Sequence, residues 1–187
     1  MPLYNFTYIV DGVDPHAEDF EDRFFEAGCD DGLLGMINGA ITVSFSREAE
    51  SYAQATISAL GNIVDAGAHA VRFEPDFLVN ASDIANRAGV SRAAVSLYRK
   101  GERGIGFPAP SIRATSKNPL WDWVSVSCWL LQQDGNSIEE DDVKNAWTSR
   151  SINQCLHKLD GKGGLFEVKE SVLFADSHSL NELVACA

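Results

Sequence analysis

Residues 81–100, ASDIANRAGVSRAAVSLYRK, carry the pattern that decides the fold in the middle of this chain. Ala85 stands where a first helix needs a small side chain so that a second helix can cross it closely. Gly89, four residues later, stands where a tight turn requires a positive φ angle. Val95 supplies an apolar contact from the second helix, and Ser91 is a suitable N-cap because its hydroxyl accepts from exposed backbone amides. The spacing predicts two short helices joined by a tight turn, a helix-turn-helix.

The net charge of −12 is distributed unevenly along the chain. Residues 1–77 carry three basic and fourteen acidic residues, residues 78–117 carry seven and two, and residues 118–187 carry five and eleven. The middle segment therefore has a charge of +5 between flanks of −11 and −6. Such an asymmetry is expected when one module faces phosphate while the others face protein or water. We therefore expect the helix-turn-helix to bind double-stranded DNA.

The first 76 residues have the pattern of an α+β domain. Alternation of apolar with polar residues indicates strands, and apolar residues at helical spacing indicate helices. The expected elements are a strand at 4–10, a helix at 17–27, a hairpin at 33–45, a helix at 49–64 and a strand at 71–73. Asn38-Gly39 is typical of a type I′ hairpin turn. The order βαββαβ predicts a ferredoxin-like domain, with both helices on one face of an antiparallel sheet.

The second expected helix of this domain has an apolar stripe at helical spacing. The stripe consists of Ala49, Ala53, Ile57, Leu60 and Val64. These side chains are expected to face the sheet.

After the helix-turn-helix the sequence is rich in glycine and proline, which end the second helix and force an extended path. Residues 111–115 and 120–121 are then predicted to pair as the two short strands of a β-wing that carries Arg113 and Lys117. Asp122 is suited to cap a following helix, whose apolar stripe packs back on the helix-turn-helix. This module is expected to span residues 77–135.

The remaining residues, 136–187, are expected to form a carboxy-terminal helical or mixed segment. Ser137-Ile138-Glu139-Glu140 is a capping box, which predicts a helix onward to about Leu159. The further expectations are a break at 161–164, strand or loop at 165–168 and 172–174, and a short helix at 180–184.

Three motifs carry a resemblance to a known family. They are DIANRAGVSRAAVSLYRKGERG from residue 83, FPAP from residue 107 and LWDWVSVSCWL from residue 120. With them, residues 78–131 resemble the winged helix-turn-helix proteins of the MerR and excisionase (AlpA-like) superfamily. In that family a proline-bearing linker leads from the recognition helix into a wing, and a tryptophan-containing strand and helix close the unit. The resemblance implies a bacterial DNA-binding regulator with an α+β domain before the module.

Recognition of DNA needs contacts to bases and contacts to phosphates. Arg92, at the start of the second helix, is the predicted base reader because its guanidinium matches the two acceptors of a guanine edge; a phosphate clamp is the alternative. Ala93 is placed to touch a thymine methyl, and basic residues farther along are expected to grip the backbone. Basic residues of the wing are expected in the minor groove or in solvent. The full set is Ser91, Arg92, Ala93, Ser96, Arg99, Lys100, Arg103, Arg113 and Lys117.

A single module of this kind buries too little surface for tight, selective binding. We therefore expect a homodimer on a two-fold-symmetric operator, with the edge of the amino-terminal sheet or the helix at 143–159 as the dimer surface. The expected role is a transcriptional repressor. The alternatives are an antitoxin-like or accessory regulator whose acidic domain binds a partner protein or a small effector, and an excisionase-like factor that bends DNA.

Other classes of function find little support in the sequence. No apolar run approaches the ~20 residues of a membrane span, and the amino terminus lacks a basic region, so a cytoplasmic, nucleoid-associated location is expected. The four cysteines are scattered without a CxxC pair and are interpreted as free thiols. The acidic run from Asp11 to Asp31 matches no calcium loop and is interpreted as a solvated face. The sequence thus indicates no catalytic residue, metal or cofactor, and we expect no enzyme.

Overall fold

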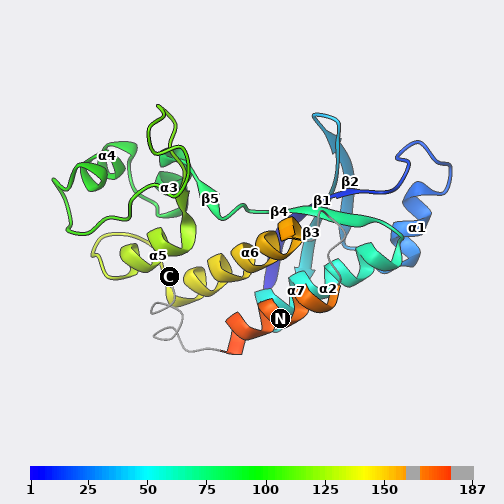
Figure 1. Ribbon diagram of the computed structural model, residues 1–187. Helices are drawn as coiled ribbons and strands as arrows, with labels where there is room; N and C mark the ends of the chain where they lie inside the picture. Colours follow the sequence, from blue (N-terminus) through cyan, green and yellow to red (C-terminus); the bar gives the residue numbers. More distant parts are fainter. Residues whose placement is uncertain (159–164, 178–187) are drawn as a thin grey trace. The chain divides into compact units, whose positions relative to one another are not determined.

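The computed structural model describes residues 1–158 and 165–177, and the chain divides into two compact units. Unit 1 comprises Met1–Pro75 and Thr148–Ser177, and the described part of unit 2 is Asp76–Trp147. The described residues form a mixed α+β structure with seven helices and a four-stranded antiparallel sheet (Figure 1). The expected break at 161–164 and the expected helix at 180–184 lie outside the described residues.

Unit 1 is built around the four-stranded sheet (Figure 1). Its strands are β1 (Leu3–Asp11), β2 (Gly32–Ile37), β3 (Ala40–Glu48) and β4 (His69–Glu74), in the spatial order β2-β3-β1-β4. The helix α1 (Phe20–Glu26) follows β1, and α2 (Tyr52–Asp65) follows β3. The elements thus follow one another in the expected order. The hairpin turn is confirmed, because Asn38 and Gly39 have φ angles of 52° and 82°, as a type I′ turn requires.

The core of unit 1 lies on one face of this sheet. The buried strand residues alternate with outward-facing neighbours, and buried residues of α1 and α2 join them in a single cluster. Phe6 is its centre, with ring centroids 5.4 Å from Phe45 and 5.7 Å from Phe73. The hydroxyl of Tyr8, fully buried, donates to the Thr56 carbonyl at 3.1 Å. Burial and the neighbouring Tyr52 hold the pKa of Tyr8 well above its ordinary value.

The predicted sheet-facing stripe of α2 is wrong in part. The helix begins at Tyr52, so Ala49 precedes it, and Val64 is 42% exposed. The buried face of the helix instead consists of Tyr52, Ala53, Ala55, Thr56, Ala59, Leu60 and Ile63. Similarly, α1 begins at Phe20, so the predicted helix at 17–27 starts too early.

The carboxy-terminal part of the described chain is helical. The helix α6 (Glu140–Lys158) has residues in both units, and α7 (Leu165–Ser177) belongs to unit 1. The expectation of strand or loop at 165–168 and 172–174 is therefore wrong. Val168 and Val172 lie four residues apart on one helix face and are fully buried in the core of unit 1, which offsets the weak helix propensity of valine.

The capping box expected at Ser137 is also wrong, because α6 begins at Glu140. The side-chain oxygen of Asn136 accepts from the Ile138 N–H at 2.8 Å and holds this stretch as a turn. The Glu139 N–H donates instead to the Asp142 carboxylate at 2.8 Å, which satisfies one amide at the helix start.

Unit 2 contains two short strands and three further helices. They are β5 (Leu78–Val79), α3 (Ala81–Arg87), α4 (Arg92–Lys100), β6 (Trp121–Asp122) and α5 (Trp123–Leu131), and β5 pairs with β6. Each helix has a side-chain N-cap: Asn80 for α3, Ser91 for α4 and Asp122 for α5. The caps predicted at Ser91 and Asp122 are confirmed.

The predicted pair of wing strands is reduced to a single bridge between Ile112 and Leu120. Arg113 has a φ angle of 55°, so the chain turns immediately after the bridge and cannot stay extended to residue 115. Trp121 pairs with Val79 of β5 instead. The residues between 112 and 120 form a loop, which we call the 113–119 loop.

Candidate nucleic-acid interface

The helices α3 and α4 are separated by a turn of four residues. Gly89, in the four-residue turn between them, has a φ angle of 64°. Ala85 is 4% exposed, and Ile84 and Val95 are fully buried between the helices and the rest of unit 2. The Val90 N–H donates to the Ala85 carbonyl at 3.0 Å and closes the turn. The crossing is therefore held both by packing and by backbone hydrogen bonds.

The helix α4 has one buried and one open face. Ala94, Val95 and Tyr98 are buried and belong to the core of unit 2. The predicted DNA-contacting residues of this helix are all exposed; they are Ser91, Arg92, Ala93, Ser96, Arg99 and Lys100. The open face carries three cations and no acid. Because side chains one turn apart share a face, this surface is continuous along the helix.

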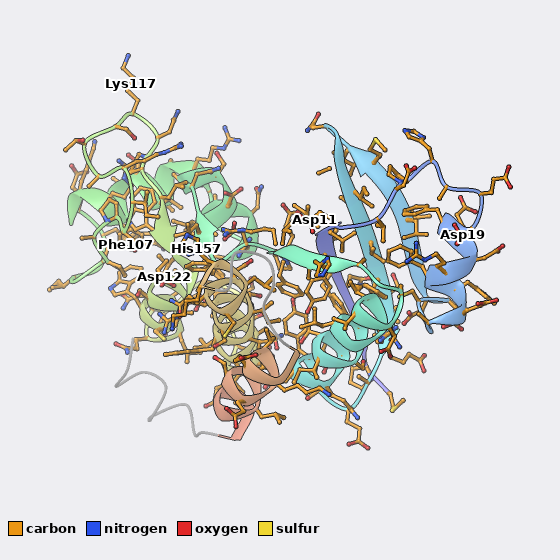
Figure 2. The ribbon with its side chains drawn as sticks, turned by 45° about the vertical axis from the view of Figure 1, so that its right-hand side comes forward. Asp11, Asp19, Phe107, Lys117, Asp122 and His157 are labelled. Carbon is orange, nitrogen blue, oxygen red and sulfur yellow. The ribbon has the colours of Figure 1, made fainter. Side chains whose placement is uncertain are left out.

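A hollow of about 430 Å³ lies beside this open face. It is lined by the start of α3, by Arg99 of α4, by the 113–119 loop and by Trp121. The loop contributes two basic lining residues, Arg113 and Lys117, and no carboxylate lines the hollow. In Figure 2, Lys117 lies at the end of its loop and points away from the body of unit 2. Three predicted contact residues that are distant in the sequence thus converge on one acid-free hollow.

Two aromatic contacts hold cations of this surface in place. The guanidinium of Arg99 lies 4.9 Å from the centroid of the Trp121 ring, and that of Arg103 lies 5.5 Å from the centroid of Tyr98. Such stacking keeps the guanidinium N–H groups available to an anion. Arg103 is exposed but does not line the hollow. Lys100 lies 4.0 Å from Glu102 in an exposed ion pair.

The linker between α4 and the 113–119 loop is fixed by two indole rings. Trp129 Nε1 donates to the Ile105 carbonyl at 2.9 Å, and Trp121 Nε1 donates to the Pro108 carbonyl at 3.1 Å. Phe107 (Figure 2) packs against both indoles, with its ring centroid 5.1 Å from that of Trp129 and 6.3 Å from that of Trp121. The sequence did not predict this role of Phe107, for which its place in a glycine- and proline-rich stretch was the available signal. The cluster holds the 113–119 loop beside α4.

In unit 1, three acidic residues line a hollow of about 330 Å³ formed by α1 and β2; they are Glu21, Asp22 and Asp30. All six acidic residues between residues 11 and 22 are exposed. No group of three or more histidine, cysteine or acidic residues placed to hold a metal occurs among the described residues. A hollow of about 520 Å³ between α2 and α7 has one basic and one acidic lining residue, Lys169 and Asp65. Neither of these hollows of unit 1 brings several cations together, in contrast to the hollow beside α4.

Cys29 is expected to react slowly with alkylating agents. Burial raises the pKa of its thiol from 9.0 to about 11; Arg47 lowers this pKa, while Asp31 and Asp30 raise it further. Two pKa units reduce the thiolate fraction at pH 8 by about a hundredfold. We expect peptide-resolved alkylation of Cys29 to be about a hundredfold slower than that of a small free thiol.

The same pKa shift has a consequence for stability. Because the pKa of the Cys29 thiol is higher in the folded state than in the unfolded state, its contribution to stability is fully present below pH 9.0 and is lost as the pH rises toward 11.

The alkylation prediction has a clear contrary outcome. Alkylation of Cys29 in the folded protein at the rate of a free thiol would show that burial does not suppress its ionisation.

Within the part of the chain that the structure describes, no helix combines the length and apolar character needed to cross a membrane. Comparison of the chain with models of protein families, with curated proteins and with solved structures found no match in any of the three.

Proposed function

We propose that this protein is a sequence-specific DNA-binding transcriptional regulator, a repressor, that contacts double-stranded DNA through unit 2. The observation that carries this proposal is the acid-free hollow in which Arg99, Arg113 and Lys117 converge beside the open face of α4. Phosphate contacts from such cations supply most of the affinity of a DNA-binding module, and an exposed helix face supplies sequence readout.

In this proposal α4 enters the major groove as the recognition helix of a winged helix-turn-helix. Arg92, which has no hydrogen-bond or ion-pair partner among the described residues, reads a guanine edge, and Ala93 and Ser96 lie on the same open face. The hollow receives a backbone phosphate. The 113–119 loop serves as the wing.

Two features support the family and domain assignments within this proposal. The strand order β2-β3-β1-β4, with buried residues of α1 and α2 in the core cluster of the sheet, supports the assignment of a ferredoxin-like domain. In unit 2, two indole N–H groups hold the linker between α4 and the wing, in the order of elements that the MerR and excisionase resemblance implies. We therefore keep the regulator of that superfamily as the proposed class.

The test is binding of the full chain to a duplex from the upstream region of its own gene and to a random duplex, over a series of salt concentrations. The affinity for both should fall with salt, by about 0.9 in log affinity per phosphate contact and per log unit of salt. We expect Lys117→Gln to weaken binding to both duplexes by a similar factor and to reduce the slope by about 0.9.

The matched control is Lys144→Gln, which removes the same charge from α6 in unit 2, away from the hollow. It should leave the affinity and the salt slope unchanged. If no duplex binds at low salt, or if both substitutions have the same effect, the hollow is not a phosphate site and the proposal fails.

A further inference from the structure

The two edges of the sheet in unit 1 differ. At one edge, β4 is closed by Asn153 of α6, whose amide accepts from the Phe73 N–H and donates to the Phe73 carbonyl, both at 2.9 Å. This side chain takes the place of a neighbouring strand. At the other edge, β2 pairs with β3 alone among the described residues. An unpaired strand edge is a template for another strand.

The strand β2 lacks the features that natural proteins use to protect such an edge. Its sequence, GLLGMI, contains no proline and no charged residue. Three of its large apolar side chains are exposed: Leu33 by 75%, Met36 by 51% and Ile37 by 61%. Phe25 of α1, which is 67% exposed, lines the same surface hollow as Leu33, together with the acidic residues Glu21, Asp22 and Asp30. The uncharged apolar surface is therefore that of β2 itself.

The charge pattern indicates what this edge accommodates. Residues 1–77 have a net charge of −11, yet residues 32–46 form a run of fifteen without any charge. A basic partner would be drawn to the acidic surfaces elsewhere in unit 1. Two copies of an acidic domain, by contrast, can meet only where the contact carries little charge. The uncharged edge thus fits a second copy of this chain.

The sequence of β2 is also self-complementary in antiparallel pairing. With Gly35 opposite the partner's Gly35, Leu33 faces the partner's Ile37, and Leu34 faces the partner's Met36. The two-residue turn makes Ile37 and Ala40 a hydrogen-bonded pair, so alternation directs the backbone groups of Leu34 and Met36 to the open edge. These are the groups that pairing in this register requires. Gly35 keeps the centre free of side chains.

We propose that two copies of this chain pair their β2 strands antiparallel, centred on Gly35, and so join their two four-stranded sheets into one. A contact of this kind is isologous and closes after two copies. The choice of a two-fold dimer also rests on the proposed function, because a two-fold operator is bound by a two-fold-symmetric protein.

The mass of the full chain in solution, measured without DNA by sedimentation equilibrium, tests the proposal. The wild type should have twice the 20.3 kDa chain mass. Ile37→Lys should be monomeric, because it places a cation opposite an apolar residue at two symmetric points. The control Val64→Lys adds the same charge at an exposed position on α2 and should remain dimeric. A monomeric wild type, or an Ile37→Lys dimer, would overturn the proposal.

Cross-linking tests the register and does not depend on the folding of the lysine variant. The double substitution Leu33→Cys and Ile37→Cys should give a disulfide-linked dimer on oxidation, because position 33 of one copy faces position 37 of the other across the two-fold axis. Four residues along one strand span about 13 Å, too far for a bond within one chain. Leu33→Cys alone should not cross-link; equal cross-linking of both variants would overturn the register. Because neither experiment uses DNA, their failure is separate from failure of the proposed function.

Discussion

Replacing Arg47 with methionine is expected to lower the free energy of unfolding of unit 1 by about 3–5 kcal/mol. Arg47, on β3, is 9% exposed and uses all five of its N–H groups. Two of them grip the Asp31 carboxylate, both at 2.7 Å. The other three bonds go to Gly28 O, Ser58 Oγ and Asn62 Oδ1, at 3.1, 3.0 and 2.8 Å.

The expected loss is large because methionine removes every one of these donors at once. The Asp31 side chain, 30% exposed, would lose its counter-ion, and the carbonyl of Gly28 would lose its donor. These bonds tie the turn after α1 to both β3 and α2, so no other contact replaces them easily. Truncating one partner of a buried charge pair costs more than the pair contributes, since the other charge is left uncompensated.

The loss is measured by urea unfolding, with hydrogen exchange of the backbone amides of unit 1 as the readout. All four tryptophans lie between residues 121 and 147, so their fluorescence reports on unit 2 and serves as an internal control. Arg23→Met is the matched substitution: Arg23 is exposed and donates one bond, to Ala66 O at 3.1 Å. This substitution should lower the free energy of unfolding by about 1 kcal/mol or less. Equal losses for the two variants would refute the importance of the Arg47 network.

Gly104→Ala is expected to destabilise unit 2 by about 2–5 kcal/mol. Gly104 has a φ angle of 72°, where a Cβ costs about 1–2 kcal/mol. A Cβ at this position would also lie 2.6 Å from Cζ2 of Trp129. The indole would have to move, which breaks its hydrogen bond to Ile105 and its packing on Phe107. Overpacking of this kind adds about 1–3 kcal/mol.

Gly106→Ala separates the two causes. Its φ angle is 77°, but nothing lies within 4 Å of the Cβ it would gain. This variant should therefore show only the backbone cost of about 1–2 kcal/mol. Urea unfolding, monitored by tryptophan fluorescence, measures the free energy of unfolding of both variants. If Gly104→Ala costs no more than Gly106→Ala, the Trp129 contact does not fix the linker.

Local signals in the sequence predicted the local structure well. The type I′ turn at Asn38-Gly39, the positive φ angle of Gly89 and the caps at Ser91 and Asp122 each depend on a few neighbouring residues, and each is confirmed. Two of the errors concern elements whose state depends on distant partners. Trp121 pairs with β5 rather than continuing the wing, and the valines of α7 become helical because the core of unit 1 buries them.

The candidate site shows the same division. Arg99 was predicted from its charge at the far end of the second helix, and Arg113 and Lys117 from their charge on the expected wing. The sequence did not indicate that they share one hollow, because that depends on the Ile112–Leu120 bridge and on how Trp121 stacks on Arg99. Arg47 was missed altogether. The alternation along β3 could have identified it, because Arg47 continues the series of inward-facing positions Ile41, Val43 and Phe45.

By itself, the sequence determined the order of helices and strands in the first 76 residues, the turns and the concentration of positive charge between residues 78 and 117. These properties follow from periodicity, turn chemistry and composition, which act over a few residues. Only the tertiary structure decided which face of α2 is buried, that residues 165–177 are helical, and that α6 contributes to the cores of both units. Burial against distant residues sets these outcomes, and it outweighs local propensity.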